Sequence, residues 1–432
     1  MNFKIILFIL ISAAASFAQE LLTLQDAIQI ALKNNFSITI ASGEKEIAAN
    51  NLSLGNAGFL PELDAEGTYS ESNTTTRQEY FDGRTIDRSG AKANNLNAAV
   101  ALNWTIFDGF RMFASLDQLK RLNEIGELNY KLAVENNIAD ITSTYYDLVR
   151  QGVVLEVITR SIAISEERVK LADQKRDVGS GSKFELLQAQ ADLNEDRSLL
   201  LQAELNYSQS KTRLNQLLGR NADAEFSVSD TIIYSTDLEL NELKNEVLER
   251  NSELRRAEEN VNLSQTELSI VRSGLFPQIS LFGSYNFLRS ESEAGFTKSN
   301  QNRGFTYGVR ASWNLFNGLN TRRQMENAAI GIEISETGLS EVKNRVEAEL
   351  QNLYKAYENS LRLVELESDN LQITEENVNI ALERLRLGNI TQLEFREAQV
   401  NLIDAQSRLV NAQFAAKNAE TELLRLSGRL IQ

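Results

Sequence analysis

Two residue types that carry much of enzyme chemistry are missing from this chain. Among its 432 residues there is no cysteine and no histidine. Their absence excludes disulfide bonds, thiolate nucleophiles, imidazole bases and the usual zinc sites. A hydrolase that uses carboxylates alone would still be possible, but the sequence contains no pocket motif for one. We therefore expect no catalytic residue, no cofactor and no metal site.

Proline is almost absent as well. The chain has only two prolines, Pro61 and Pro277. Because proline breaks helices, this scarcity leaves room for very long uninterrupted helices. The residue before a proline prefers extended backbone, so we expect both prolines to mark helix-to-strand transitions.

The N-terminus has the features of a targeting segment. Lys4 precedes an apolar run at residues 5–11, and small residues lead up to Ala18. This pattern is typical of a signal peptide at residues 1–18, and the apolar run is too short for a membrane anchor. The formal net charge of −16 also argues against nucleic acid as a partner.

The strongest pattern in the sequence is a tandem duplication. A motif of the form Trp-x-x-Phe-x-Gly occurs at residues 104–109 and again at residues 313–318, which is an offset of 209 (313 − 104). The same offset relates the Gly-Arg pair that begins at Gly219 to the pair that begins at Gly428. Similarity at a fixed offset indicates two copies of one supersecondary unit.

Upstream of the motif the offset is larger. Pro61 corresponds to Pro277, an offset of 216 (277 − 61), so seven residues are gained between the proline and the tryptophan of the first copy. Loop tips tolerate such insertions. We divide the chain into a first structural repeat at residues 19–219, a linker at residues 220–239 and a second repeat at residues 240–432.

Each repeat contains a segment in which apolar and polar residues alternate. We expect β-hairpins at residues 61–107 and 277–316, with exposed polar loops at residues 72–94 and 290–304. Each strand would be about ten to twelve residues long, the span of a tilted transmembrane strand. The apolar face of the second hairpin would comprise Ile279, Leu281, Gly283, Tyr285, Phe287, Phe305, Tyr307, Val309, Ala311, Trp313 and Leu315.

Helical patterns occupy most of the remaining sequence. We expect long helices at residues 109–178 and 318–387, each about 105 Å long at about 1.5 Å per residue. Glycine-containing turns then reverse the chain into return helices at residues 183–218 and 391–427.

A short amphipathic helix opens each repeat. It ends at Asn35 in the first copy and at Asn251 in the second, and either asparagine can cap a following helix by accepting backbone N–H bonds. In the first copy we expect that following helix to continue to Gly58. The long helix of this copy carries a seam with alternating three- and four-residue spacing, which is typical of a coiled coil. The seam residues are Ile138, Ile141, Tyr145, Leu148, Gly152, Leu155, Thr159 and Ile162.

Four amphipathic strands in one chain raise a physical problem. They are too few to close a barrel, since about eight is the smallest workable number, and open strand edges cannot lie in lipid. The strands could form an ordinary soluble layer packed on helices. We favour the alternative in which several copies of the chain pool their strands into one membrane barrel and their helices into a second, helical barrel.

The chain resembles the TolC family of bacterial outer-membrane efflux proteins over nearly all of the sequence that follows the signal peptide. The motifs that carry the resemblance are Leu-x-x-Ala-Ile-x-x-Ala-Leu-x-x-Asn at residues 24–35, Leu60-Pro61, Ile106-Phe107-Asp108-Gly109, and the two glycine turns with their downstream carboxylates. The resemblance implies a mainly α protein with transmembrane β-structure. Its trimer would form a 12-stranded β-barrel, with four strands from each chain, joined to a long periplasmic α-helical barrel.

The same resemblance assigns roles to acidic residues after the glycine turns. In the family, acidic residues six and nine positions after the second turn line a constriction, and Glu394 and Glu397 occupy those positions after Gly388. Three-fold symmetry would make each a ring of three carboxylates, which selects cations and binds divalent ions. In the first copy Glu185 matches position six, but Gln188 occupies position nine. The alternative is that these glutamates are ordinary solvated helix surface.

The turns themselves are the contact that the resemblance implies for a periplasmic adaptor. The matching residues are Val178, Gly179, Ser180, Leu387, Gly388 and Asn389. Glycine permits a positive φ and close approach of a partner's backbone. The family's gate also uses a tyrosine and an arginine beside the second turn, where this chain has Leu385 and Ile390. Its latch must therefore differ, with Arg176, Arg384 and Arg386 as candidates.

We therefore expect a passive channel-tunnel in the cell outer membrane that extends into the periplasm. It would be the exit duct of a tripartite efflux or type I secretion system, coupled to the adaptor (membrane fusion) protein and an inner-membrane transporter. Drug efflux and protein secretion share such a duct, and both stay open. The alternative from another class is a secreted coiled-coil structural or adhesion protein.

Overall fold

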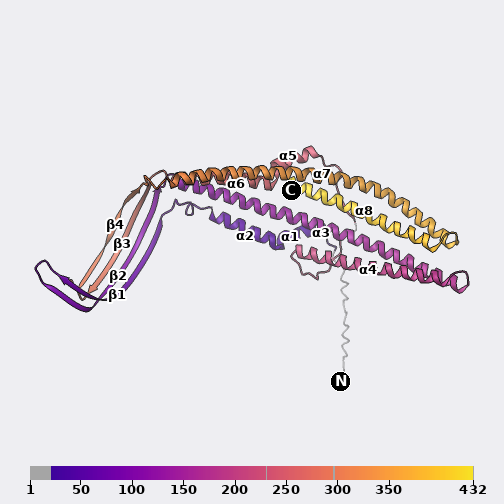
Figure 1. Cartoon of the computed structure of the whole chain (residues 1–432), viewed down its shortest axis with the longest axis horizontal. Coiled ribbons are helices and arrows are strands. Elements are labelled where there is room, and N and C mark those ends of the chain that lie inside the picture. Colours follow the sequence, from indigo (N-terminus) through magenta and orange to yellow (C-terminus); the bar gives the residue numbers. More distant parts are fainter. Residues whose placement is uncertain (1–20, 230, 295–296, 432) are drawn as a thin grey trace, which may run out of the picture. The chain divides into compact units, whose positions relative to one another are not determined.

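The computed structural model describes residues 21–229, 231–294 and 297–431, so the expected signal peptide at residues 1–18 lies outside the described part. Within this part the chain is mainly α-helical and contains one four-stranded sheet, as expected (Figure 1). Among the described residues, no helix is both long enough and apolar enough to cross a membrane.

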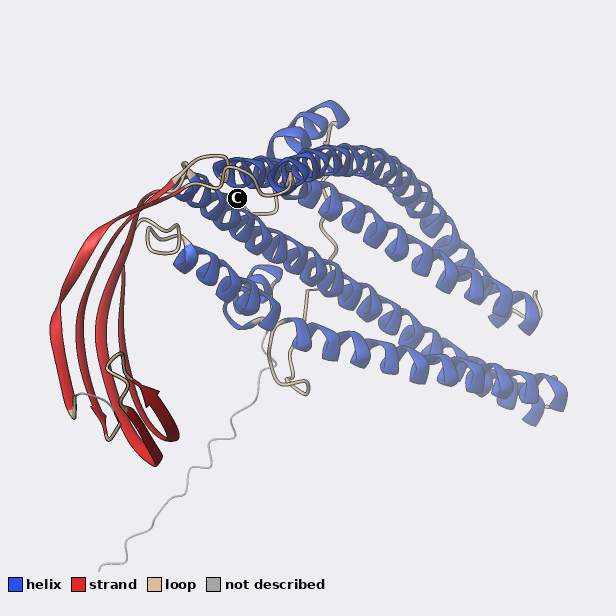
Figure 2. Ribbon diagram, turned by 60° about the vertical axis from the view of Figure 1, so that its left-hand side comes forward, coloured by secondary structure: helices blue, strands red, loops and turns tan. Residues whose placement is uncertain are grey.

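Both copies of the duplication contain the same six elements in the same order. Figure 2 shows the helices and the strands of the chain in separate colours. The first copy comprises α1 (Leu24–Asn34), α2 (Phe36–Asn51), β1 (Glu62–Glu79), β2 (Thr85–Phe107), α3 (Arg111–Asp177) and α4 (Lys183–Leu217). The second comprises α5 (Leu240–Arg250), α6 (Ser252–Ser273), β3 (Gln278–Ser292), β4 (Ser299–Ser312), α7 (Asn320–Arg386) and α8 (Gln392–Leu426). Helices α3 and α7 each have 67 residues.

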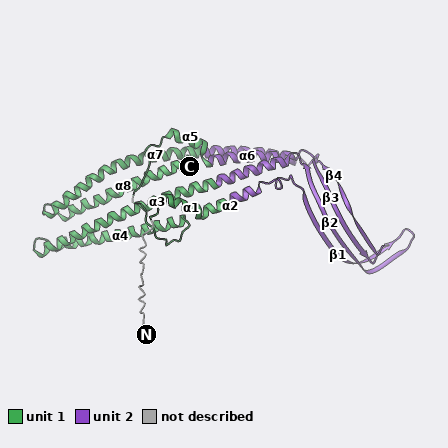
Figure 3. Cartoon of the chain, turned by 180° about the vertical axis from the view of Figure 1, so that it is seen from behind, with its two compact units in different colours: residues 1–42, 130–252, 344–432 green, residues 43–129, 253–343 purple. Residues whose placement is uncertain are grey.

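The chain forms two compact units, and neither coincides with a sequence repeat (Figure 3). Unit 1 consists of residues 1–42, 130–252 and 344–432, and unit 2 of residues 43–129 and 253–343. Each unit therefore contains segments from both copies. Unit 2 holds all four strands, and unit 1 holds both glycine turns.

The sheet has the order β1-β2-β3-β4 with antiparallel neighbours, so β1 and β4 are its edges. The apolar residues share one face, as the alternation predicted. Val100 lies between Ala65 and Tyr285, and Tyr285 lies opposite Phe305. This apolar face is largely exposed in the single chain: Phe305 is 79% and Tyr307 84% exposed.

The prediction of short strands was wrong. The strands have 18, 23, 15 and 14 residues instead of ten to twelve. The expected loops at residues 72–94 and 290–304 are mostly strand, since the first hairpin stays paired as far as Glu79 and Thr85 and β4 begins at Ser299. Strand pairing uses the backbone, and polar Ser, Thr and Asn side chains do not prevent it where a strand leaves an apolar environment.

A tryptophan anchors the start of the hairpin in each copy. Pro61 lies directly before β1 and Pro277 directly before β3. The Trp104 Nε1–H donates to the Phe59 carbonyl at 2.9 Å, and Trp313 makes the equivalent bond in the second copy at 3.1 Å. The indole therefore fixes the segment that leads into each proline.

Three helix boundaries differ from expectation, and one of them is the start of α7, which begins at Asn320 instead of Gly318 because residues 318 and 319 adopt positive φ. Helix α2 ends at Asn51 instead of Gly58, because the Asn56 side chain donates to the Asn51 carbonyl at 2.9 Å and the Ser53 hydroxyl accepts from the Asn56 N–H at 3.2 Å. Such local bonds compete with helical ones. Helix α3 begins two residues later than expected, because the residue pair 109–110 adopts positive φ.

The coiled-coil seam of α3 is correct only in its first half. Ile138, Ile141, Tyr145 and Leu148 are buried. Thr159, expected on the seam, is exposed. Towards the turn the buried stripe lies one residue earlier in the sequence and is largely polar; its members are Ser161, Ser165, Arg168 and Ala172.

The start of each repeat is tied to the end of its return helix by an asparagine. Asn35 caps α2, as predicted, by accepting backbone N–H bonds from Ser37 and Ile38 at 2.8 and 3.1 Å. Its Nδ2 donates to the Leu217 carbonyl at 2.7 Å, and Asn251 makes the same bond to the end of α8 at 2.9 Å. Both asparagines are buried, so both donors are satisfied inside unit 1.

Gly219→Ala should destabilise the protein more than Gly428→Ala. Both glycines follow a return helix with left-handed backbone, at φ of 63° and 70°, so a Cβ at either position costs about 1–2 kcal/mol. At Gly219 the Cβ would also lie 2.5 Å from the Asn34 carbonyl oxygen, whereas at Gly428 the nearest atom, the Arg250 Cβ, would be 3.1 Å away. The measurement is the unfolding temperature of the helices by circular dichroism at one scan rate. Equal losses would contradict the close approach at Gly219.

Candidate functional site

The two long helices, α3 and α7, both end within unit 1, in the same hydrogen-bonded turn. After α3, the Gly179 N–H donates to the Arg176 carbonyl at 3.0 Å and the Ser180 N–H to the Lys175 carbonyl at 2.9 Å. The turn at Gly388 repeats both bonds at 3.1 and 2.8 Å. This Schellman arrangement requires a left-handed residue, and glycine supplies it at φ of 74° and 77°.

The residues expected to dock an adaptor are open in the single chain. Val178 is 78% and Leu387 73% exposed. A Cβ added to Gly179 or Gly388 would meet no atom within 4 Å. Both turns therefore present an apolar side chain beside accessible backbone.

Two of the three expected gate carboxylates cap the return helices. The Glu185 N–H donates to the Ser182 hydroxyl at 3.2 Å, and Glu185 Oε2 accepts from the Ser182 N–H at 3.3 Å. Glu394 does the same with Thr391, at 3.2 and 2.6 Å, and also accepts from the Thr391 hydroxyl at 2.9 Å. These bonds lower the pKa of the Glu394 carboxyl. The Ser/Thr-x-x-Glu pattern of a capping box was present in the sequence and predicts this geometry.

The structure brings part of the expected site together around one open cavity. This cavity has a volume of about 520 Å³ and is lined from both turns. The expected site residues that line it are Ser180, Glu185, Gly388, Asn389 and Glu394. Glu397 is not among the lining residues; it lies one helical turn further along α8 and is exposed.

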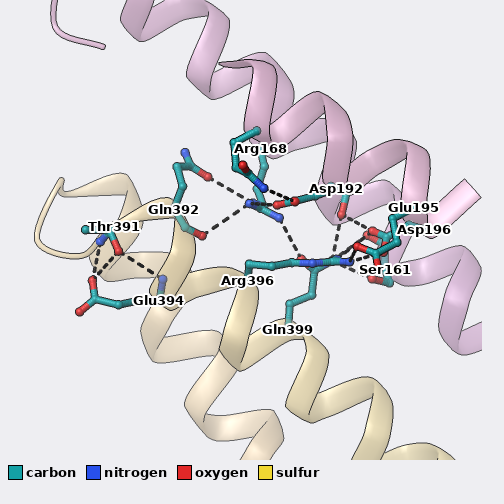
Figure 4. A network of polar contacts seen from close by, with 12 residues as sticks. Ser161, Arg168, Asp192, Glu195, Asp196, Thr391, Gln392, Glu394, Arg396 and Gln399 are labelled. Carbon is teal, nitrogen blue, oxygen red and sulfur yellow. Dashed lines mark hydrogen bonds and ion pairs between the residues drawn. The ribbon is translucent and has the colours of Figure 1, made fainter. Parts of the chain in front are cut away.

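A buried arginine behind the turns connects three helices (Figure 4). Arg168 is 2% exposed, and its guanidinium donates to Asp192 at 2.9 Å, to Gln392 at 3.2 Å and to Gln399 at 3.4 Å. Burial lowers its pKa, although the bond and charge of Asp192 oppose the shift. Because Arg168 lies on α3, Asp192 on α4 and the two glutamines on α8, this one side chain joins both copies of the duplication.

A second arginine extends the network. Arg396 on α8 binds both oxygens of Asp196 on α4, at 2.8 and 3.1 Å. Asp196 is 1% exposed and also accepts a 2.6 Å bond from the Ser165 hydroxyl. Burial opposes the charge of Arg396, but the hydrogen bonds and charge of Asp196 outweigh it and raise the Arg396 pKa. The buried carboxylate is therefore fully paired, as the low polarity of its surroundings demands.

The latch candidates differ in what they contact. Arg386 at the end of α7 donates to Glu167 on α3 at 3.0 Å, so it links the two copies. Arg176 instead pairs with Asp173 and Asp177 on its own helix, at 2.9 and 2.6 Å.

Sequence reasoning missed the buried polar network. Its signals were present: Asp192 and Asp196 are four residues apart on α4, and Ser161, Ser165 and Arg168 continue the seam spacing of α3. The predicted seam ran through Thr159 and Ile162, whereas the buried stripe lies one residue earlier, so its polar members were not recognised. Within the described residues, no group of three or more acidic side chains is placed to hold a metal ion.

Comparisons with known proteins agree with this architecture. The profile of a family described as outer membrane efflux protein matches residues 27–220 and 243–429. The probable efflux pump outer membrane protein TtgC of Pseudomonas putida is 21% identical over 94% of this chain and 82% of its own length. The proteases secretion protein PrtF of Dickeya chrysanthemi is 19% identical over 92% of this chain and 86% of its own.

The fold is also that of solved channels. The crystal structure of the CmeC outer membrane channel of Campylobacter jejuni matches with a TM-score of 0.79 at 18% identity, covering 94% of this chain and 85% of that one. The fold expected from the resemblance, a mainly helical protein with four antiparallel strands per chain, is confirmed. Because the family profile covers most of both repeats, the chain belongs to the outer membrane efflux protein family.

Proposed function

We propose that the chain is one protomer of a homotrimeric channel-tunnel that provides a passive exit duct through the outer membrane. The observation that carries this function is the open sheet, which has an exposed apolar face and two unpaired edges. Unpaired edges cannot lie in lipid, and four strands cannot close a barrel. Three copies supply twelve strands, and their 67-residue helices supply the wall of a periplasmic tunnel.

We infer that the duct works with a periplasmic adaptor and an inner-membrane transporter. TtgC is named as part of an efflux pump and PrtF as a protease secretion protein, so relatives with this plan serve both kinds of transport. The transporter then selects the substrate and supplies the energy, and the duct performs no catalytic step. A secreted coiled-coil structural protein would not explain the exposed apolar face of the sheet.

The purified protein should be a conducting oligomer. In detergent it should have about three times the mass of the 48.5 kDa chain, because only closure of the strands satisfies their edges. In planar bilayers it should open channels of uniform conductance. A stable monomer that gives no conductance would refute the duct.

We assign the constriction of the duct to Glu185, Glu394 and Glu397. In support of this assignment, the first two line one cavity at the turns and Glu397 is exposed on the same helix as Glu394. Both bonds from Thr391 end on Glu394 Oε2, so Oε1 is left to face a permeating cation. Glu394 can therefore both cap α8 and line the constriction, because the capping bonds hold its carboxylate in place and keep it ionised.

We assign adaptor docking to the turns, at Val178, Gly179, Ser180, Leu387, Gly388 and Asn389. An exposed apolar residue precedes an accessible glycine in both copies. Three chains would present six such turns. Because the turn after α3 and the turn after α7 have the same arrangement, one adaptor surface could bind either of them.

Removing the carboxylates should weaken block of the channel by divalent cations. For Glu394→Gln with Glu397→Gln we expect the half-blocking concentration to rise about tenfold, or about 1.4 kcal/mol of binding free energy. Glu204→Gln, an exposed glutamate elsewhere on α4, is the control and should leave block unchanged. Unchanged block in the double variant would remove the gate assignment.

The pH dependence of the block should report the capping bonds. Because these bonds lower the pKa of Glu394, the carboxylate stays charged as the pH falls through the ordinary glutamate value of about 4.3. In a Glu397→Gln background, block should therefore persist below that pH. Thr391→Val removes one donor and should shift the loss of block to higher pH. Identical profiles would contradict the role of the cap.

We infer that the buried network holds the start of α8 against α3 and α4 and so positions the gate carboxylates. Arg396→Met should cost about 3–5 kcal/mol, because it leaves the buried Asp196 charge unpaired. Adding Asp196→Leu should recover part of this loss. Arg408→Met breaks a half-exposed pair with Glu367 and should cost no more than about 1 kcal/mol. Thermal unfolding measures the loss of stability in all three variants. Equal losses for Arg396→Met and Arg408→Met would contradict the role of the network.

A further inference from the structure

The two copies of the duplication meet at one junction inside the sheet. There β2, the last strand of the first copy, pairs with β3, the first strand of the second copy. In a ring of chains, β4 must pair with β1 of a neighbouring chain, because these two strands are the free edges. That outer junction again joins the last strand of one copy to the first strand of the next. The observed junction is therefore a template for the one between chains.

We propose that β4 pairs with β1 of a second copy of this chain in the register of the β2–β3 junction, which rests on the trimer proposed above. In the observed junction Val100 faces Tyr285. Adding 209 to the β2 residue and subtracting 216 from the β3 residue gives the equivalent pair, Val309 facing Tyr69 of the partner subunit. The pairs from residue 302 to residue 314 follow, with residue numbers that add up to 378. The template has a register shift between Thr105 and Phe107, so beyond it Phe316 faces Leu63 of the partner subunit.

The lengths of the edge strands agree with this register. Glu79 of the partner subunit, the last residue of its β1, faces Ser299, the first residue of β4. At the other end, Phe316 faces Leu63 of the partner subunit, the second residue of its β1, because the template pairs Phe107 with Ile279. In the single chain β4 stops at Ser312, whereas β2 continues to Phe107, the counterpart of Phe316. We infer that residues 313–316 extend β4 once the partner strand is present, so that β1 is paired from Leu63 to Glu79.

Exposure of equivalent residues supports the same junction. Phe107 is half-buried, but its counterpart Phe316 is 78% exposed. A Cβ at Gly109 would lie 2.4 Å from the carbonyl oxygen of Ser273, a residue of the second copy, whereas the counterpart Gly318 has no neighbour closer than 3.9 Å. The end of the first hairpin is thus covered by the segment that leads into β3. At the end of the second hairpin, the described residues of unit 2 leave Phe316 exposed. We infer that the segment leading into β1 of a neighbouring chain covers this end, as the segment leading into β3 covers the end of the first hairpin.

A competing register follows from charge alone. If β4 slid four residues along β1, Arg310 would face Asp64 of the partner subunit, and Arg303 would face Glu71 of the partner subunit. Ion pairs between exposed side chains contribute little. This register would also leave the last four residues of β1 without partners on β4. The template register instead reproduces contacts already present between β2 and β3, including a β-branched residue against an aromatic ring.

The absence of cysteine makes the register directly measurable. Thr306→Cys is combined with Ser72→Cys for the proposed register, with Thr68→Cys for the charge register, and with Ser70→Cys for the register between them. All four positions lie on the polar face of the sheet, and each change is nearly isosteric. In one chain β1 and β4 are opposite edges, so a disulfide can form only between subunits.

Oxidation of the folded oligomer should crosslink the Ser72 combination about tenfold faster than the other two, because a disulfide needs Cβ atoms of directly opposed residues. Asn314→Cys with Asp64→Cys should also crosslink, which tests the extension of β4 beyond Ser312. Each single-cysteine variant is the control and should give no covalent oligomer.

Other outcomes overturn the register in distinguishable ways. Fastest crosslinking through Thr68→Cys or Ser70→Cys in an intact trimer rejects the template register and leaves the duct standing. Equal, slow crosslinking of all three combinations in an intact trimer also rejects it. A protein that is monomeric in every variant, including the cysteine-free parent, rejects the duct itself.

Discussion

The backbone hydrogen bonds along β1 and β4 are incomplete in a single chain. Lipid offers no donors or acceptors to replace them, and the sheet exposes apolar residues such as Tyr307 on one face. Pairing with further copies satisfies both demands at once, because it closes the edges and places the apolar face against lipid. Four strands per chain require more than one chain to close the barrel, and the number of chains then fixes how many helices surround the tunnel.

Because of the duplication, both copies contribute equally to the sheet that must be closed. Each copy supplies one hairpin and one helical hairpin, and the same contacts recur in both, as with Asn35 and Asn251 at the ends of the return helices. Where the copies differ, the difference marks an interface that the single chain leaves open. Phe107 and Phe316 are equivalent in sequence but not in burial. In a duplicated chain, the contact between the two copies therefore indicates how one chain contacts the next.

Much of the fold followed from sequence because it rests on local rules. Two prolines, an alternating pattern and uninterrupted helical periodicity were sufficient to place the hairpins and the long helices, and the family match confirmed the fold and its class of function. Strand length was underestimated because backbone pairing continues through polar residues such as those at positions 72–79. The site was only partly predictable. The positions of Glu185 and Glu394 came from the resemblance, whereas their capping bonds depend on a short pattern that was overlooked. The network around Arg168 depends on three helices meeting, which no single stretch of sequence specifies.

Burying Arg168, Asp192 and Asp196 behind the turns is costly, and apolar residues would pack there with less desolvation. Apolar contacts are not directional, however, and a seam of leucines can slide by a turn with little penalty. Arg396 donates to both oxygens of Asp196, and Arg168 donates to Asp192 and to two glutamines. Only one register of α8 against α3 and α4 therefore satisfies all of these polar groups. The small neighbours Ser161 and Ser165 let the helices approach closely enough for these bonds. We infer that the charges are retained for this register, since Glu394 and Glu397, which we propose as gate residues, lie on the same turns of α8 and a slip there would displace both.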